Sequence, residues 1–111
     1  MESWSCDVQA PFSVCAGSAG RFNLEDFYGA GYLVSLFRAA PGQREYTDAA
    51  VAAGLLHAQN EGQPDNRHSL WMARVGRRML SKGLESEVRY AARKSWLDVV
   101  PSFDGHRIAL D

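Results

Sequence analysis

The 111-residue sequence contains only two cysteines and lacks a long hydrophobic run. Cys6 and Cys15 are too few to staple a fold of this size, so we expect two reduced, partly buried thiols. The absence of about 20 consecutive apolar residues excludes a membrane-spanning helix. The N-terminal residues also lack the basic start and apolar core of a secretory signal peptide. We therefore expect a cytoplasmic protein with no membrane association.

Motifs for metal binding and catalysis are also missing. The histidines His57, His68 and His106 do not form an i, i+4 helical pair, and there is no Cys-x-x-Cys, so we predict no metal site and no cofactor. The sequence lacks a Gly-x-Ser-x-Gly elbow. Residues 17–20 form a glycine-containing loop without the Lys-Ser or Lys-Thr that ends a phosphate-binding loop. We predict no catalytic residues and no enzymatic activity, with an enzyme whose site leaves no motif as an alternative.

Basic charge is concentrated in residues 67–94, although the whole chain carries a net charge of −1. This stretch holds eight Lys or Arg residues and two acids, whereas residues 1–66 hold three bases and eight acids. Clustered basic charge of this kind is typical of a surface that meets an anion, most often a nucleic-acid backbone.

The apolar spacing after Asn23 predicts a first helix that ends near Ala40. Gly29 and Gly31 lie inside it, and each disfavours a helix by about 1 kcal/mol unless another element packs against the bare backbone. A strand over residues 32–37 is therefore the competing interpretation.

Two more helices are predicted further along the chain. Thr47 is a good N-cap for a second helix over residues 48–58. A third helix is expected to begin at Asp65 or Asn66 and to end at Gly83, which suits a left-handed C-terminal position. At about 100° per residue, this third helix has two distinct faces. The apolar face contains Met72, Ala73, Val75, Gly76, Met79 and Leu80, and the basic face contains Arg67, Arg74 and Arg78 with Trp71 beside them.

The C-terminal third is expected to contain a β-hairpin. Asp104 and Gly105 predict a two-residue turn with positive φ at both positions, and residues 106–110 alternate as a returning strand. Residues 87–100 suit a strand or the start of a fourth helix, and short strands are expected within residues 3–14. We predict a single domain over residues 1–111 with an α+β fold of three helices, a C-terminal hairpin and short N-terminal strands. A mixed sheet covered on one side by helices is the alternative.

The run ARVGRRMLSKGL over residues 73–84, followed by basic residues and a glycine-containing turn, resembles the last helix and wing of winged helix-turn-helix domains. The resemblance covers residues 65–110 and is greatest to the domains attached to phage and plasmid primase-helicases. It implies a small DNA-binding accessory protein of a mobile element. Residues 94–103 are longer and more apolar than a simple wing requires.

We therefore predict a nucleic-acid-binding surface on the third helix and the wing. Basic side chains neutralise phosphates, and Trp71 would stack on a base of a single strand. The predicted contact residues are Arg67, Trp71, Arg74, Arg77, Arg78, Lys82, Arg89, Arg93 and Lys94. The alternative function is a protein-binding module or homodimer without catalytic activity, because Trp and Tyr are enriched in interfaces.

Overall fold

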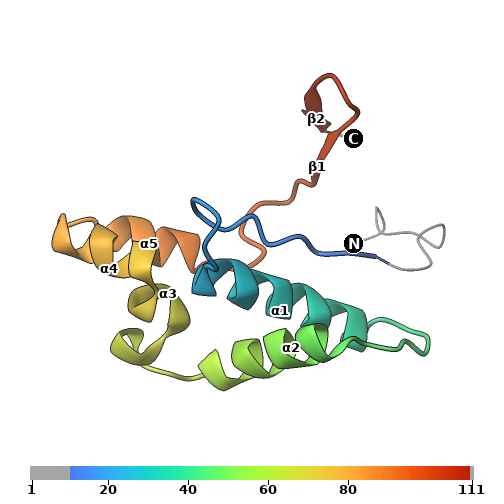
Figure 1. The fold of residues 1–111 in the computed structure, drawn as a ribbon, viewed down its shortest axis with the longest axis horizontal. Helices are drawn as coiled ribbons and strands as arrows, with labels where there is room; N and C mark the ends of the chain where they lie inside the picture. The colour runs from blue at the N-terminus through green and yellow to red at the C-terminus, as the bar shows by residue number, and fades with distance from the viewer. Residues whose placement is uncertain (1–10, 111) are drawn as a thin grey trace. The chain divides into compact units, whose positions relative to one another are not determined.

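The computed structural model describes residues 11–110. Within them lie α1 (Leu24–Ala39), α2 (Asp48–Asn60), the 3-10 helix η2 (Asp65–Arg67), α3 (Ser69–Met72), α4 (Arg74–Ser81), α5 (Glu85–Ala91), β1 (Pro101–Phe103) and β2 (Ile108–Leu110) (Figure 1). The described residues divide into two compact units, one of Ser13–Ala92 and one that includes residues 11–12 and 93–110. The expectation that these units form one domain stays a prediction.

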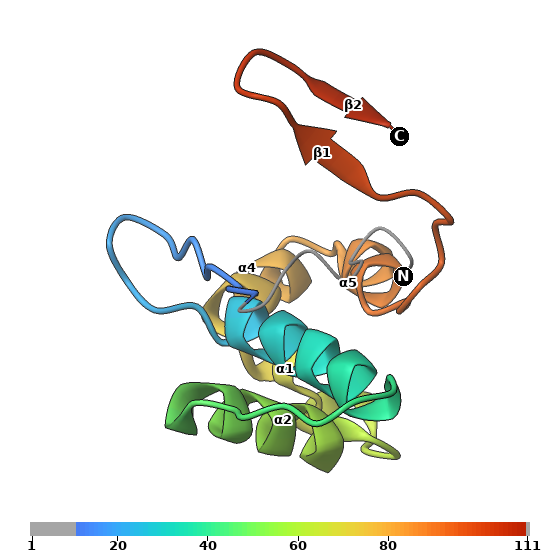
Figure 2. The same ribbon diagram turned by 90° about the vertical axis from the view of Figure 1, so that its right-hand side faces the viewer.

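The N-terminal unit is built on a close pair of helices, α1 and α2, which run side by side (Figure 2). A Cβ atom at Gly31 would overlap the carbonyl oxygen of Ala53 and would lie 2.9 Å from the Cβ of His57. A Cβ atom at Gly54 would lie 3.2 Å from Cγ1 of Val34. Gly31 therefore allows the backbone of α2 to approach α1 closely. This close packing is the condition under which a glycine inside α1 is tolerated.

Both predicted N-terminal helices are confirmed. α1 begins directly after Asn23 and ends at Ala39, so the alternative of a strand over residues 32–37 is wrong. α2 begins after Thr47, whose hydroxyl accepts a hydrogen bond from the N–H of Ala50 at 3.2 Å. It continues to Asn60, slightly beyond the predicted end.

The predicted third helix is wrong as a single element, because the structure breaks it into η2, α3 and α4. His68 and Ala73 separate these pieces with extended backbone, at ψ 141° and 153°. Gly76 allows α4 to pack tightly against α3 across the break at Ala73, because a Cβ atom at Gly76 would overlap the carbonyl oxygen of Leu70. The predicted end is confirmed, since Gly83 has φ +74° and follows the last turn of α4.

The break removes the continuous basic face on which the winged-helix prediction depended. Each of the three pieces begins its own helical rotation, so residues on either side of Ala73 do not share a face. Trp71, expected among the basic side chains, is buried at 8% exposure. It belongs to a small core with Tyr28, Ala53, Ala73 and Val88.

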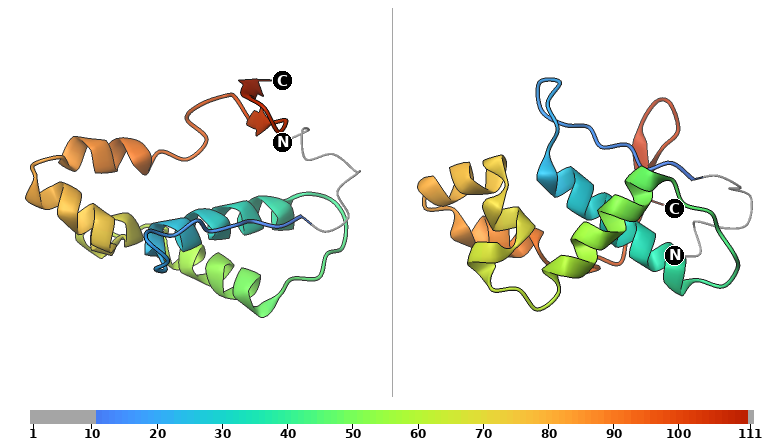
Figure 3. Two further views of the ribbon diagram at one scale, coloured as in Figure 1. Left: turned by 45° about the horizontal axis from the view of Figure 1, so that its top comes forward. Right: turned by 60° about the horizontal axis from the view of Figure 1, so that its bottom comes forward.

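Of residues 87–100, which were open between strand and helix, only 87–91 are helical, within α5, which begins at Glu85 and packs against α4 (Figure 3). Residues 92–100 belong to neither a helix nor a strand. The described chain thus has five α-helices and one two-stranded sheet, so the three-helix winged fold is wrong. The expected N-terminal strands are not found in residues 11–14, and their earlier part lies outside the described residues.

The C-terminal hairpin is confirmed, with β1 and β2 antiparallel. Its turn differs from the prediction, because Gly105 has φ +99° while Asp104 does not adopt positive φ. Instead, Oδ1 of Asp104 accepts hydrogen bonds from the N–H groups of His106 at 2.8 Å and Arg107 at 2.9 Å. The side chain of Asp104 therefore closes this turn together with the backbone, because the N–H of Asp104 donates to the carbonyl oxygen of Arg107 at 3.2 Å.

Two further features of the described residues bear on predictions from the sequence. Cys15 is a free thiol but is exposed rather than partly buried, and Cys6 lies outside the described residues. In the part of the chain that the structure describes, no helix is long and apolar enough to cross a membrane.

Candidate anion-binding site

The loop that precedes α1 is held in a tight turn by its own backbone. Ser18 and Arg21 exchange two hydrogen bonds, in which the N–H of Ser18 donates at 3.0 Å and the N–H of Arg21 donates at 2.9 Å. Between them Ala19 and Gly20 have positive φ, at 51° and 75°. The chain therefore reverses at residues 18–21 and presents Arg21 at the surface.

Side chains from α1 fix this loop further. The N–H of Gly17 donates to Oδ2 of Asp26 at 2.8 Å, and Nδ2 of Asn23 donates to Oγ of Ser18 at 2.7 Å. Asn23 occupies the N-cap position of α1, as the sequence predicts, but its side chain makes no capping hydrogen bond. The N-terminal end of a 16-residue helix therefore faces the loop without a cap from Asn23.

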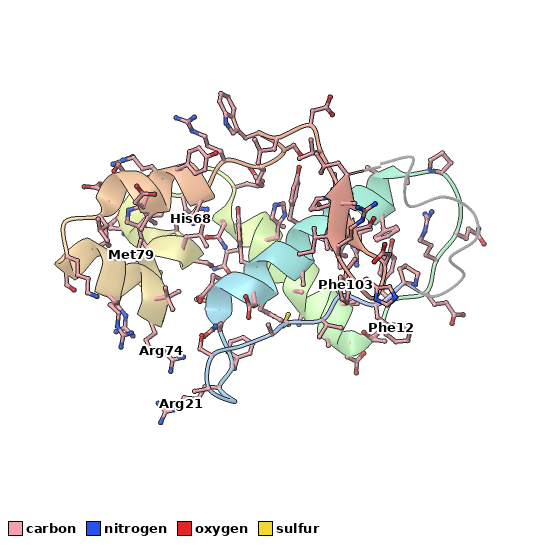
Figure 4. The ribbon with its side chains drawn as sticks, turned by 90° about the horizontal axis from the view of Figure 1, so that it is seen from above. Phe12, Arg21, His68, Arg74, Met79 and Phe103 are labelled. Atoms are coloured by element: carbon pink, nitrogen blue, oxygen red, sulfur yellow. The ribbon has the colours of Figure 1, made fainter. Side chains whose placement is uncertain are left out.

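Arg74 connects this loop to α4, 51 residues later in the chain. Its Nη2 donates to Oδ1 of Asn23 at 3.1 Å. Figure 4 shows Arg21 and Arg74 extending on the same side of the ribbon in that view, near the start of α1. The loop, the N-terminal end of α1 and the start of α4 thus meet at Asn23.

The groups here include donors suited to an anion and, in the first turn of α1, the carboxylates of Glu25 and Asp26. A helix N-terminus carries partial positive charge and unpaired N–H groups, and arginine binds phosphate, carboxylate and related oxyanions through paired N–H donors. Arg77 and Arg78 add charge on the exposed surface of α4. We define the anion site as Ser18, Arg21, Asn23, Arg74 and the first turn of α1.

The structure brings together only part of the predicted basic surface. Arg74, Arg77 and Arg78 lie on α4, and Lys82 follows as its C-cap residue. Arg67 lies on η2, before the break. Arg93 and Lys94 belong to the other unit, where the Arg93 guanidinium lies 4.7 Å from the ring centroid of Trp96.

Arg89 is engaged within the N-terminal unit. Its guanidinium forms ion pairs with Asp65 at 2.6 Å and with Glu85 at 2.7 Å, and it lies 5.8 Å from the ring centroid of Trp71. The hydrogen bond to Glu85 and the charge of Asp65 raise the pKa of Arg89. Arg89 therefore joins η2, α3 and α5.

Two histidines lie in an aromatic cluster between the helices. His57 is buried, with its ring centroid 5.4 Å from those of both Tyr28 and Tyr32. Nδ1 of His68 accepts the N–H of Leu70 at 3.1 Å, so this residue caps α3. Across the described residues, no three His, Cys, Asp or Glu side chains are grouped to hold a metal ion.

Sequence reasoning missed Ser18, Arg21 and Asn23 as site residues. The sequence predicts a glycine-containing loop at residues 17–20 before a helix, and this loop lacks the Lys-Ser or Lys-Thr ending of a phosphate-binding loop. The sequence signal that points to these residues is a glycine-containing loop followed by a helix. The bond to Arg74 has no local sequence signature.

Comparison with known proteins identifies the chain's relatives. A family model described as 2-phosphosulpholactate phosphatase matches residues 10–106. A protein of Clostridium botulinum named "Probable 2-phosphosulfolactate phosphatase" is 30% identical over 95 residues, which are 86% of this chain and 39% of that protein. One of the same name from Carboxydothermus hydrogenoformans is 35% identical over 91 residues, covering 82% of this chain and 35% of the relative. The chain thus spans about two-fifths of the length of these relatives.

These matches overturn several expectations. The resemblance to winged helix-turn-helix domains is wrong, because the matched family is one of phosphatases. For the same reason the prediction of a DNA-binding accessory protein of a mobile element is wrong, and so is the prediction of no enzymatic activity. The physical reason is that a count of basic residues does not distinguish a nucleic-acid backbone from a small oxyanion. The predicted contacts of the basic residues with a ligand stay predictions.

Proposed function

The chain belongs to the 2-phosphosulpholactate phosphatase family, and we propose that it supplies the anion-binding part of a phosphatase acting on 2-phosphosulfolactate. The observation that carries this proposal is the family match over residues 10–106. In the proposed reaction, a water oxygen attacks phosphorus and the P–O ester bond breaks. The products are inorganic phosphate and sulfolactate, whose 2-hydroxyl takes a proton.

The anion site suits this substrate class. 2-Phosphosulfolactate carries a phosphate, a sulfonate and a carboxylate, all of which are anionic near neutral pH. In the proposal, Arg21 and the first-turn N–H groups of α1 bind one of these groups, and Arg74, oriented by Asn23, binds another. Positive groups fixed around a transferring phosphoryl group also stabilise its transition state.

Because the relatives are much longer, the proposal assigns only binding to this chain. The groups that activate water are placed in the part of the relatives that the chain does not match. The assay measures release of inorganic phosphate from 2-phosphosulfolactate, and the purified chain by itself is expected to release none. The same assay is then applied to the Carboxydothermus hydrogenoformans relative after its 91 matched residues are exchanged for those of this chain.

The exchanged enzyme, in contrast, is expected to release phosphate from 2-phosphosulfolactate. Circular dichroism establishes that the exchanged enzyme is folded. A folded exchanged enzyme without activity on this substrate would contradict the proposal.

Within that enzyme, Arg21→Ala and Arg74→Ala are each expected to lower kcat/KM by about tenfold or more, because each removes a charged contact to the substrate. Arg38→Ala is the matched control. Arg38 is an exposed arginine in the last turn of α1, at the opposite end of the helix from the anion site. Equal losses from all three variants would argue against a specific site at the start of α1.

A further inference from the structure

α4 has a basic face that continues from the anion site along the helix. Arg74, Arg77 and Arg78 are all exposed, whereas Gly76 is buried. At about 100° per residue, the three arginines lie within an arc of about 100° around the helix axis. Gly76 lies on the opposite side, where a Cβ atom would overlap the carbonyl oxygen of Leu70. α4 therefore packs on one side and presents its arginines on the other.

The positive charges of this face are not neutralised by ion pairs. Among residues 11–110, no arginine of α4 takes part in an ion pair, whereas Arg89 pairs with Asp65 and Glu85. Like charges at i, i+4 spacing, as at Arg74 and Arg78, destabilise a helix. Arg74 also begins α4, where positive charge opposes the helix dipole. An anion bound at this face offsets both effects.

The anion site needs more positive charge than its own residues supply. Arg21 and Arg74 carry two positive charges, and the first turn of α1 carries two negative charges on Glu25 and Asp26, so these four side chains sum to zero. The phosphate, sulfonate and carboxylate of 2-phosphosulfolactate are all anionic. The rest of the basic face of α4, which begins at Arg74, supplies the additional positive charge.

Helix geometry favours Arg78 as the residue that acts together with Arg74. Arg78 lies four residues after Arg74 and about 40° from it around the axis, whereas Arg77 lies about 60° away on the other side. In the substrate, the sulfonate is on the carbon next to the one that carries the phosphate ester and the carboxylate. Groups bound by Arg74 and Arg78 can therefore belong to one substrate molecule, each held by the paired N–H donors of a guanidinium.

We propose that Arg78 binds the sulfonate of 2-phosphosulfolactate and thereby selects this substrate over phosphate esters that lack a sulfonate. This inference rests on the proposed function, because it names the residue that recognises one group of that substrate. Contact by Arg77 and a general effect of charge on α4 are the competing explanations, and the experiment distinguishes them.

The test is calorimetric titration of the purified chain with 2-phosphosulfolactate and with 2-phosphoglycerate, which carries a hydroxyl in place of the sulfonate. Both compounds stay intact, because the chain alone is expected to release no phosphate. At about 0.15 M salt, the chain is expected to bind 2-phosphosulfolactate at least about tenfold more tightly than 2-phosphoglycerate. Arg78→Gln is expected to reduce this preference to less than about twofold, and to change the affinity for 2-phosphoglycerate by less than about threefold.

Arg77→Gln is the matched control, because it removes the same charge from the same exposed face of α4. It is expected to leave the preference within about twofold of that of the unsubstituted chain. Equal losses of preference from both variants would show a general effect of charge and contradict the proposal. A loss from Arg77→Gln alone would also contradict it. Circular dichroism establishes that each variant is folded.

The unsubstituted chain gives a further decisive result. If it bound neither compound, or bound both equally, the inference would be overturned. The outcomes also separate this inference from the proposed function. An exchanged enzyme that is active on 2-phosphosulfolactate, together with a preference that Arg78→Gln leaves unchanged, would contradict only the inference. A preference that depends on Arg78, together with a folded but inactive exchanged enzyme, would contradict only the proposed function.

Discussion

Gly31 and Gly29 lie two positions apart in α1 but experience different surroundings. A Cβ atom at Gly31 would overlap the carbonyl oxygen of Ala53, whereas a Cβ atom at Gly29 would meet none of the described atoms within 4 Å. We expect Gly31→Ala to lower the free energy of unfolding by about 1–3 kcal/mol, because α1 and α2 must separate. We expect Gly29→Ala to raise it by about 1 kcal/mol, because alanine favours a helix. Urea unfolding followed by circular dichroism measures both.

The opposite signs are the informative result, since the two substitutions are chemically identical. If Gly31→Ala were also stabilising, the close approach of α2 at this position would be wrong.

Asp104 makes the C-terminal turn sensitive to acid. The N–H groups of Arg107 and His106 donate to its carboxylate and lower the pKa of Asp104 below its ordinary 3.8. A lowered folded pKa means that the ionised form stabilises the turn above the unfolded pKa, and that this stability is lost as pH falls through the folded pKa. We expect the amide resonances of His106 and Arg107 to shift as pH falls below about 4.

Asp104→Asn provides the control for this titration. An amide oxygen can accept the same two hydrogen bonds but does not titrate. In the variant these two amide resonances are expected to stay constant over the same pH range. A matching shift in the variant would show that another group controls the turn.

Asn23 shows what the sequence reveals of a single site residue. Its N-cap position could be predicted, because asparagine before an acidic first turn is a local signal. Its contacts could not be predicted, because Oδ1 accepts from Arg74, which is remote in sequence. The predicted list of contact residues accordingly contains Arg74 but omits Asn23 and Arg21.

At the scale of elements, α2 and α3 are joined by a buried polar contact. The N–H of Ser69 donates to Oδ1 of Asn60 at 2.7 Å, and Nδ2 of Asn60 donates to Oγ of Ser69 at 2.8 Å. Both residues are buried. Asn60→Ala leaves the buried N–H of Ser69 without this acceptor, so we expect the free energy of unfolding to fall by about 1–3 kcal/mol.

The neighbouring residue gives a matched control for this contact. Gln59 has a similar side chain and is exposed in the same turn of α2. Gln59→Ala is expected to change the free energy of unfolding by less than about 0.5 kcal/mol in the same denaturant experiment. Comparable losses from both variants would mean that helix propensity, rather than the contact between α2 and α3, explains the effect.

The elements that could be predicted are those with local signals at both ends. α1, α2 and the hairpin have capping residues, apolar spacing or turn residues that can be read within a few positions. The break at Ala73 has no such signal, because alanine favours a helix. It depends on the contact between the backbone at Gly76 and Leu70, which only the folded chain contains. This one break caused the error in the fold and in the basic surface.

At the scale of the whole molecule, the basic residues and the apolar segment of residues 94–103 depart from the winged-helix prediction in different ways. The prediction that basic residues meet an anion retains a role in the proposed function, where Arg74 binds a substrate group instead of a phosphate backbone. Residues 94–103 depart from a simple wing in their structure, because only residues 101–103 form a strand and residues 94–100 belong to neither a helix nor a strand.

The two units of the chain are therefore expected to differ in stability when the chain is alone. Backbone amides in α1 and α2 form a close pair of helices with a buried core, whereas the hairpin exposes its apolar face. Amides open with free energies that follow local packing. We expect amides of α1 and α2 to exchange at least about a hundredfold more slowly than those of β1 and β2, measured by hydrogen exchange with mass spectrometry. Phe103→Asp should leave the slow class unchanged, because it alters only the hairpin. Equal protection of both units in the isolated chain would contradict this expectation.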